Sequence, residues 1–169
     1  MDDSVKPIND LGLDTAIMTE KQGTQADEAA SKVQSADLAI LRSKMNVLNT
    51  RLQPYGDISE IPQSEVKQIK CILGAIVQQL GFAILEIRAM IQASGNAVRQ
   101  LEAGRKCLEA AIQEFDTADR DDFLTTGQDL EDLFQAYKGR NQDEEELLQK
   151  YTVLMDHVLS ICFKFEQST

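Results

Sequence analysis

The sequence predicts an all-α protein, an antiparallel bundle of four to five helices with coiled-coil-like heptad packing. Apolar residues recur at steps of three and four through most of the chain, and no segment alternates with the period of two that a strand requires. Hydrophobic residues make up 43% of the sequence but aromatic residues only 5%, with no tryptophan. An aliphatic core of this kind is typical of helical bundles.

Residues 1–25 are predicted to form a flexible acidic tail, because apolar residues are isolated among Asp, Gly, Thr and Pro. Residues 26–169 are predicted to form a single helical-bundle domain. Its first helix is expected over about 26–53, because Pro54 and Gly56 follow at once. The inner face of this helix is marked by a seam of leucine and methionine: Leu38, Leu41, Met45, Leu48 and Leu52.

The next helix, expected over 64–94, carries the longest hydrophobic pattern, with Ser64 as its N-cap. Residues 71–85 contain no charge, but the run is shorter than the roughly 20 residues of a membrane span, so we expect a buried core helix. Gly74 and Gly81 lie one heptad apart, which indicates either a closely approaching partner helix or tolerated glycines. The seam consists of Val66, Ile69, Leu73, Ile76, Leu80, Ala83, Ile87 and Met90.

The same phase continues beyond Gly95, through Ala97, Leu101 and Leu108. Either 64–115 is one continuous helix and the protein is elongated, or Gly95 ends one helix and Asn96 caps another over 96–116. The size of a compact domain of this length favours a break or kink at Gly95.

Two further helices are expected over about 119–138 and 142–166. The first should end at Gly139, and the second begins with Asp143, Glu144, Glu145 and Glu146, where the helix dipole favours acids. Tyr151, Met155 and Val158 belong to the seam of this last helix.

The formal net charge is −11, and the acids are concentrated in 1–30 and 116–146. Phosphate-backbone binding requires clustered positive charge, so recognition of nucleic acid is not expected. The three cysteines, Cys71, Cys107 and Cys162, are widely spaced on predicted helices, which predicts buried free thiols in a reducing, cytoplasmic compartment. The amino terminus lacks the basic and apolar segments of a Sec signal peptide, and export by another route stays open.

No pattern predicts a catalytic site, a metal site or a cofactor. The acidic turn over 117–128 fits two of five key positions of a helix–loop–helix calcium site and lacks its bidentate glutamate at Gln128. His157 is the only histidine and has no ligand or carboxylate partner at helical spacing. We therefore expect no enzymatic activity and no small-molecule substrate.

These observations predict a non-enzymatic protein–protein interaction module, such as a scaffold, adaptor or secretion- or assembly-associated protein. It would bind a partner helix or self-associate into an oligomer through its apolar heptad seams. The residues predicted to bind the partner are Gly74, Leu80 and Gly81 on the central helix and Asp143, Glu144, Glu145 and Glu146 at the acidic edge. The alternative is a membrane-perturbing protein that is stored in soluble form and uses the charge-free segment 71–85.

Overall fold

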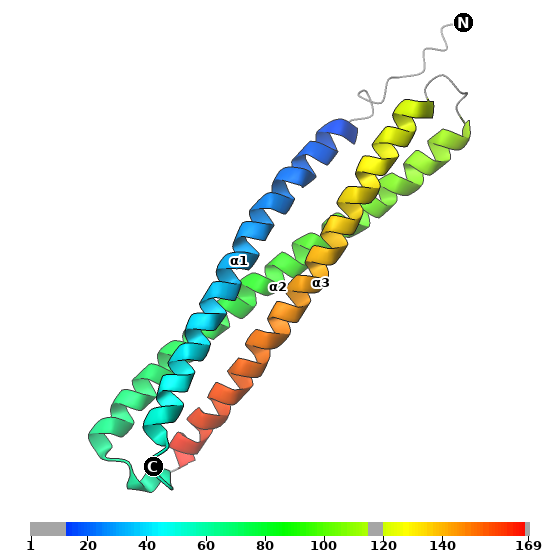
Figure 1. Ribbon diagram of the computed structural model, residues 1–169. Helices are drawn as coiled ribbons and strands as arrows, with labels where there is room; N and C mark the ends of the chain where they lie inside the picture. Colours follow the sequence, from blue (N-terminus) through cyan, green and yellow to red (C-terminus); the bar gives the residue numbers. More distant parts are fainter. Residues whose placement is uncertain (1–12, 115–119, 168–169) are drawn as a thin grey trace, which may run out of the picture. The chain divides into compact units, whose positions relative to one another are not determined.

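The computed structural model confirms the all-α fold (Figure 1). It describes residues 13–114 and 120–167, with side chains from residue 32 onward in the first range and from residue 121 in the second. Three long helices and one short 3-10 helix follow one another along the chain: α1 (Leu13–Leu52), η2 (Ile58–Glu60), α2 (Gln63–Glu114) and α3 (Arg120–Gln167). The described residues contain no strand.

The prediction of four to five helices is not confirmed, because three long helices account for the described residues. The predicted break at Gly95 is wrong, and so is the predicted end at Gly139, since α2 and α3 run through these positions. Residues 13–25, expected in a flexible tail, belong to α1. The remainder of the predicted tail, 1–12, lies outside the described residues.

A side chain from α3 explains why α2 continues through Gly95. The Asn141 amide donates hydrogen bonds to the Ile91 carbonyl oxygen at 3.0 Å and to Ser94 Oγ at 2.9 Å. The same amide nitrogen lies 3.6 Å from the position that a Cβ on Gly95 would occupy. A glycine inside a helix costs about 1 kcal/mol relative to alanine, and these tertiary contacts offset a cost of that size.

Helix α3 continues past Gly139 because its inward-facing pattern is not interrupted. Tyr137, Arg140, Glu144 and Leu147 step by three and four, and all four residues are buried. Two of these positions are charged, so a search for apolar residues alone ends the pattern at Tyr137. The charged segment after Gly139 is therefore a helical segment with a polar inner face.

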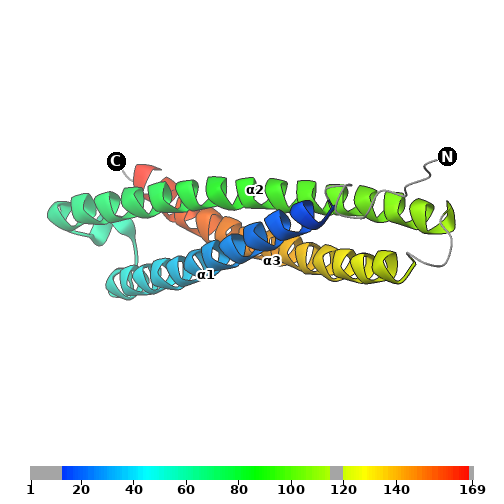
Figure 2. The same cartoon turned by 90° about the horizontal axis from the view of Figure 1, so that it is seen from above.

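The chain divides into two compact units, and each is described separately. Unit 2 comprises residues 31–89 and 144–169, and unit 1 comprises residues 1–30 and 90–143. In unit 2, the cyan end of α1, the first half of α2 and the orange-to-red end of α3 lie side by side (Figures 1 and 2). Its core contains residues from all three helices, among them Met45, Leu48, Ile69, Leu73, Ile76, Leu80, Ile87, Tyr151, Val158 and Phe165.

Short polar contacts hold the connection between α1 and α2 in unit 2. The Asp57 carboxylate caps η2 by accepting a hydrogen bond of 2.7 Å from the Ile58 amide. The Tyr55 hydroxyl donates to Glu65 at 2.7 Å, and Arg51 lies 3.8 Å from the same carboxylate. Because Glu65 stands in the first turn of α2, these contacts tie the end of α1 to the start of α2.

In unit 1 the described side chains come from α2 and α3. Their buried cluster contains Ala97, Leu101, Leu108, Phe123, Leu130, Leu133, Phe134 and Tyr137. A Cβ on Gly127 would lie 3.3 Å from Leu108 Cδ2, so the two helices approach closely at this point. Arg105 forms a 2.5 Å ion pair with Glu131, and its guanidinium stacks 4.8 Å from the centre of the Phe134 ring.

Candidate functional site

The residues predicted to bind a partner occupy different environments in unit 2. Leu80 is 0% exposed and belongs to the core. Gly81 is half-buried, and a Cβ there would lie 3.9 Å from the Met155 methyl group. Gly74 is exposed with open space around it, so no helix of the described chain approaches closely at this glycine. Partner binding by these three residues stays a prediction.

The acidic edge is also divided. Glu144 is completely buried, whereas Glu145 and Glu146 are exposed in unit 2, and Asp143 is exposed at the end of unit 1. Only three of the four acids are therefore available to a partner. Their role in partner binding also stays a prediction.

The charge-free segment 71–85 is only partly covered. Its inward seam is buried, but Phe82 and Leu85 are each 62% exposed. By length and composition α2 could cross a membrane, and 28% of its most apolar window is buried. The expectation of a buried core helix holds for one side of this segment, and the other side is an exposed apolar surface.

An apolar groove runs between α1 and α2 in unit 2. One part, a hollow of about 550 Å³, is lined by Ile40, Ser43, Lys44, Val47, Leu48, Arg51, Ile72, Ala75, Ile76 and Gln79. A second hollow of about 410 Å³ is lined by Gln34, Asp37, Ile40, Leu41, Lys44, Gln79, Phe82, Ala83 and Glu86. The hollows share Ile40, Lys44 and Gln79, so together they form one continuous groove, which we call the α1–α2 groove.

The two ends of the α1–α2 groove carry opposite charges. Lys44 and Arg51 lie in the hollow near the end of α1, where no acid contributes to the lining. Asp37 and Glu86 lie in the other hollow. The first hollow is therefore mainly apolar with Arg51 at its end, the second hollow carries Asp37 and Glu86 among apolar side chains, and Lys44 lies between them.

One partly buried and one buried hydrogen bond join the three helices at the acidic end of the groove. The Gln34 amide donates to the Glu86 carboxylate, and the Tyr151 hydroxyl donates to the Gln34 carbonyl oxygen. Tyr151 is completely buried, and this burial, together with the charges of Asp37 and Glu86, raises the pKa of its hydroxyl to about 12. Three helices thus meet at a polar layer directly below the groove.

The outward face of α1 beside the groove carries a stripe that the sequence analysis missed. Val33, Ile40 and Val47 are spaced by seven and are 58%, 54% and 60% exposed. The seven-residue spacing of these residues is visible in the sequence, but the stronger apolar pattern of the inner seam of α1 runs beside it. An exposed apolar stripe at heptad spacing is typical of a helix that packs against another helix.

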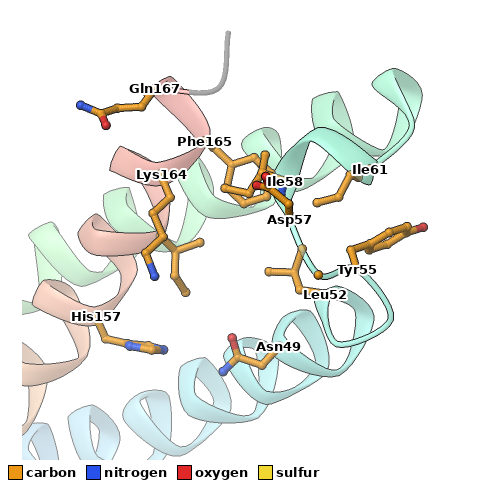
Figure 3. Close-up of a pocket in the computed structure, with 12 residues that line it drawn as sticks. Asn49, Leu52, Tyr55, Asp57, Ile58, Ile61, His157, Lys164, Phe165 and Gln167 are labelled. Carbon is orange, nitrogen blue, oxygen red and sulfur yellow. The ribbon is translucent and has the colours of Figure 1, made fainter.

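Unit 2 also contains a polar pocket of about 610 Å³ between the end of α1, the η2 connection and the end of α3 (Figure 3). In Figure 3, His157 and Lys164 of α3 and Asn49 of α1 point toward the same space, above apolar walls such as Leu52. His157 is exposed and lies in a pocket that its sequence position did not reveal. No hydrogen bond joins His157 to another side chain among residues 32–114 and 121–167, so the geometry supplies no acid–base pair there.

The prediction of buried thiols is wrong for two of the three cysteines. Cys71 and Cys107 are exposed, whereas Cys162 is half-buried, and all three are free. Burial and the nearby Glu166 raise the pKa of the Cys162 thiol. These thiols do not form a metal site with other ligands, since the described side chains contain no group of three or more His, Cys, Asp or Glu residues placed to hold an ion.

Of the 117–128 turn, Asp121, Asp122 and Gln128 lie in α3. Thr117 and Asp119 are outside the described residues, so the calcium-loop pattern is described only in its helical part. No family model matches the sequence, and no match was found among curated proteins or solved structures. The α1–α2 groove is the structural feature that bears most directly on function.

Proposed function

We propose that the protein is a non-enzymatic interaction module that binds an amphipathic α-helix in the α1–α2 groove of unit 2. The observation that carries this proposal is the exposure of large apolar side chains at one groove. Ile40 and Val47 line its α1 wall, Phe82 lines its α2 wall, and Val33 continues the α1 stripe one heptad before Ile40. Soluble proteins rarely leave a contiguous apolar surface of this kind without a binding role.

Burial of this surface supplies a driving force for binding. Full burial of a Val, Ile or Phe side chain is worth about 1.5–3 kcal/mol, and each of these four side chains is more than half exposed. The α1 wall from Gln34 to Arg51 covers about five turns at 3.6 residues per turn, which is long enough to seat a helix with anchors at i, i+3/i+4 and i+7.

The charges at the ends of the groove define the chemistry of the bound helix. Acidic side chains on that helix would face Lys44 and Arg51, and basic side chains would face Asp37 and Glu86. Such rim charges contribute more to orientation than to affinity. The groove thus favours an amphipathic helix with an apolar stripe, acids at one end and bases at the other.

The experiment uses a designed helical peptide with this pattern and measures its binding to the full chain by calorimetry. Val47→Glu places a charge in the groove and should abolish binding, since a buried unpaired carboxylate costs several kcal/mol. Val153→Glu is the matched control, because Val153 is 63% exposed on α3 and lines neither hollow of the groove. Equal binding by both variants would contradict the proposal.

A second candidate function is membrane perturbation by the segment 71–85. The observation in its favour is that only 28% of the most apolar window of α2 is buried. Flotation with anionic and neutral liposomes at acidic and neutral pH tests it. Lipid association that Phe82→Glu removes would support this function, and no association under any of these conditions would end it.

A further inference from the structure

We propose that the helix bound in the α1–α2 groove is α1 of a second copy of this chain, docked antiparallel about a two-fold axis at Ile40. This inference rests on the proposed function and names the partner. Its premise is that the exposed face of unit 2 is complementary to itself after a rotation of 180°. Two-fold interfaces require self-complementarity of this kind, because the same patch serves both copies.

The apolar stripe satisfies this requirement. Val33 and Val47 stand seven residues before and seven residues after Ile40, so an axis through Ile40 places each valine opposite the other valine of the second copy. Ile40 then packs against its own counterpart. The residues that flank the stripe on one side, Ala36 and Ser43, are small and exposed, which permits close approach of the two helices.

The charges of the docking face also satisfy the requirement of self-complementarity. Asp37 lies three residues before Ile40 and Lys44 lies four residues after it, so the axis brings Asp37 of each copy beside Lys44 of the other. The acidic end of each groove, with Glu86, meets the basic end of the other, with Arg51. Two reciprocal ion pairs form at the rim of one apolar interface.

Parallel docking of the same faces lacks this complementarity. It would set Lys44 and Arg51 of one copy at the level of Lys44 and Arg51 of the other, and like charges at close range disfavour a complex. The geometry therefore favours the antiparallel arrangement over the parallel one. It also explains how a chain with a net charge of −11 associates with itself, since the docking face carries both signs.

Disulfide cross-linking tests the register directly, in full-length protein whose three native cysteines are replaced by serine. Copies carrying Val33→Cys and copies carrying Val47→Cys bear different mass tags and are mixed before oxidation. Antiparallel docking predicts that the mixed pair cross-links and that neither variant cross-links efficiently with itself. Val153→Cys, equally exposed on α3, is the control and should remain unlinked.

Two cross-linking results would overturn the inference. Self-linking of Val33→Cys at the rate of the mixed pair indicates parallel docking. No linking in any pair, with a light-scattering mass that stays at 18.8 kDa across a concentration series, indicates that the chain does not self-associate. The inference predicts a mass that approaches twice this value, and Val47→Glu should return it to that of the monomer.

Charge reversal gives a second test that leaves the apolar stripe intact. Asp37→Lys or Lys44→Asp alone should weaken the dimer roughly tenfold, because each replaces two ion pairs by two repulsive contacts. The combined variant should recover wild-type association within about twofold, since the pairs re-form with reversed signs. A combined variant as weak as the single variants would contradict the antiparallel pairing.

The outcome also separates this inference from the proposed function. If the wild-type chain is a monomer but the designed peptide binds and Val47→Glu abolishes its binding, the groove accepts a helix and the second copy is the wrong partner. If the chain neither self-associates nor binds the peptide, both proposals fail.

Discussion

Unit 2 and unit 1 differ in how deeply their described side chains are buried. In unit 2, Leu80, Ile87, Tyr151 and Val158 are completely buried between segments of three helices. In unit 1, the described cluster comes from α2 and α3, and its side chains are 2–8% exposed, with Phe123 the most buried. In unit 2, α1 forms one wall of the core, and its outer side forms one wall of the α1–α2 groove.

Apolar residues at heptad spacing form both the buried inner seam and the exposed stripe of this protein. Apart from the half-buried Met90, the inner seam of α2 is buried in both units, from Ile69 to Leu108. Unit 1 supplements its seam with polar contacts, notably Asn141 with Ser94 and Arg105 with Glu131. Among the described side chains, those of unit 2 include more completely buried apolar residues, and unit 2 also has exposed apolar residues on the outside of α1 and α2. Core depth and exposed apolar surface thus occur together in unit 2.

The largest effect is expected from a charge in the core of unit 2. Leu80→Asp buries an unpaired carboxylate at a cost of several kcal/mol, against a total stability of about 5–15 kcal/mol for a domain, and should abolish cooperative thermal unfolding. Leu85→Asp, on the same helix but 62% exposed, is the control and should melt near the wild-type temperature. A wild-type melting temperature for Leu80→Asp would show that unit 2 is not built as described.

A smaller loss is expected at the polar crossing of unit 1. Asn141→Ala removes two hydrogen bonds and uncovers the buried Ser94 and the half-buried Gly95, so stability should fall by about 1–3 kcal/mol in urea titrations. Gln142→Ala, one residue further along α3 and exposed, should change stability little. If the two variants are equally stable, Asn141 is not what supports α2 at Gly95.

The polar layer of unit 2 should give a pH-dependent effect at alkaline pH. The hydroxyl of Tyr151 has a pKa of about 12 in the folded protein and about 10 when unfolded, so its contribution is complete below pH 10 and is lost as pH rises toward 12. The loss is on the order of 2 kcal/mol. Thermal melts between pH 9 and about pH 11.5 should show this decrease for the wild type and a smaller one for Tyr151→Phe.

The variant Tyr55→Phe distinguishes the alkaline loss of stability assigned to Tyr151 from any loss caused by Tyr55. The hydrogen bond from Tyr55 to Glu65 also raises the pKa of the Tyr55 hydroxyl, but Tyr55 is only half-buried, whereas Tyr151 is completely buried. Tyr55→Phe should therefore retain most of the alkaline decrease. A decrease that disappears with Tyr55→Phe and persists with Tyr151→Phe would contradict the assignment.

The smallest effects are expected at the glycines of unit 1. Gly104 and Gly139 have open space where a Cβ would lie, so Gly104→Ala and Gly139→Ala should each raise stability by about 0.5–1 kcal/mol through helix propensity. Gly127→Ala should gain less, because its Cβ would lie 3.3 Å from Leu108 Cδ2. Chemical denaturation measures all three, and a loss of stability in Gly139→Ala would mean that α3 is not helical there.

The helical fold and the inner face of α2 could be predicted from the sequence because both depend on apolar periodicity. Val66 and the residues from Ile69 to Leu108 were assigned to one seam in one phase, and Ile69, Leu73, Ile76, Leu80 and Ile87 are buried. The continuity of α2 could not be predicted with the same reasoning. The local sequence around Gly95 favours a break, and the contacts that oppose it come from Asn141, 46 residues further along the chain.

The candidate site was less accessible to sequence analysis. Buried Arg140 and Glu144 continue the inner face of α3 with charged residues, so a search for apolar positions divided one helix into two. The exposed stripe of α1 was overlooked because two of its members, Ile40 and Val47, directly precede the inner-seam residues Leu41 and Leu48. The stripe indicates a binding surface only in the folded protein, where Phe82 of α2 lines the opposite wall of the same groove.

Hydroxyl-radical footprinting of the full chain over a concentration series tests whether the α1–α2 groove is the docking surface. Phe82 and Phe163 are 62% and 59% exposed, so they should react at similar rates in dilute solution. As the concentration rises, docking of a second copy in the α1–α2 groove should protect Ile40, Val47 and Phe82, while Phe163 and Val153 remain reactive. Protection of Phe163 and Val153 with continued reactivity of Phe82 would contradict the assignment of the α1–α2 groove as the docking surface.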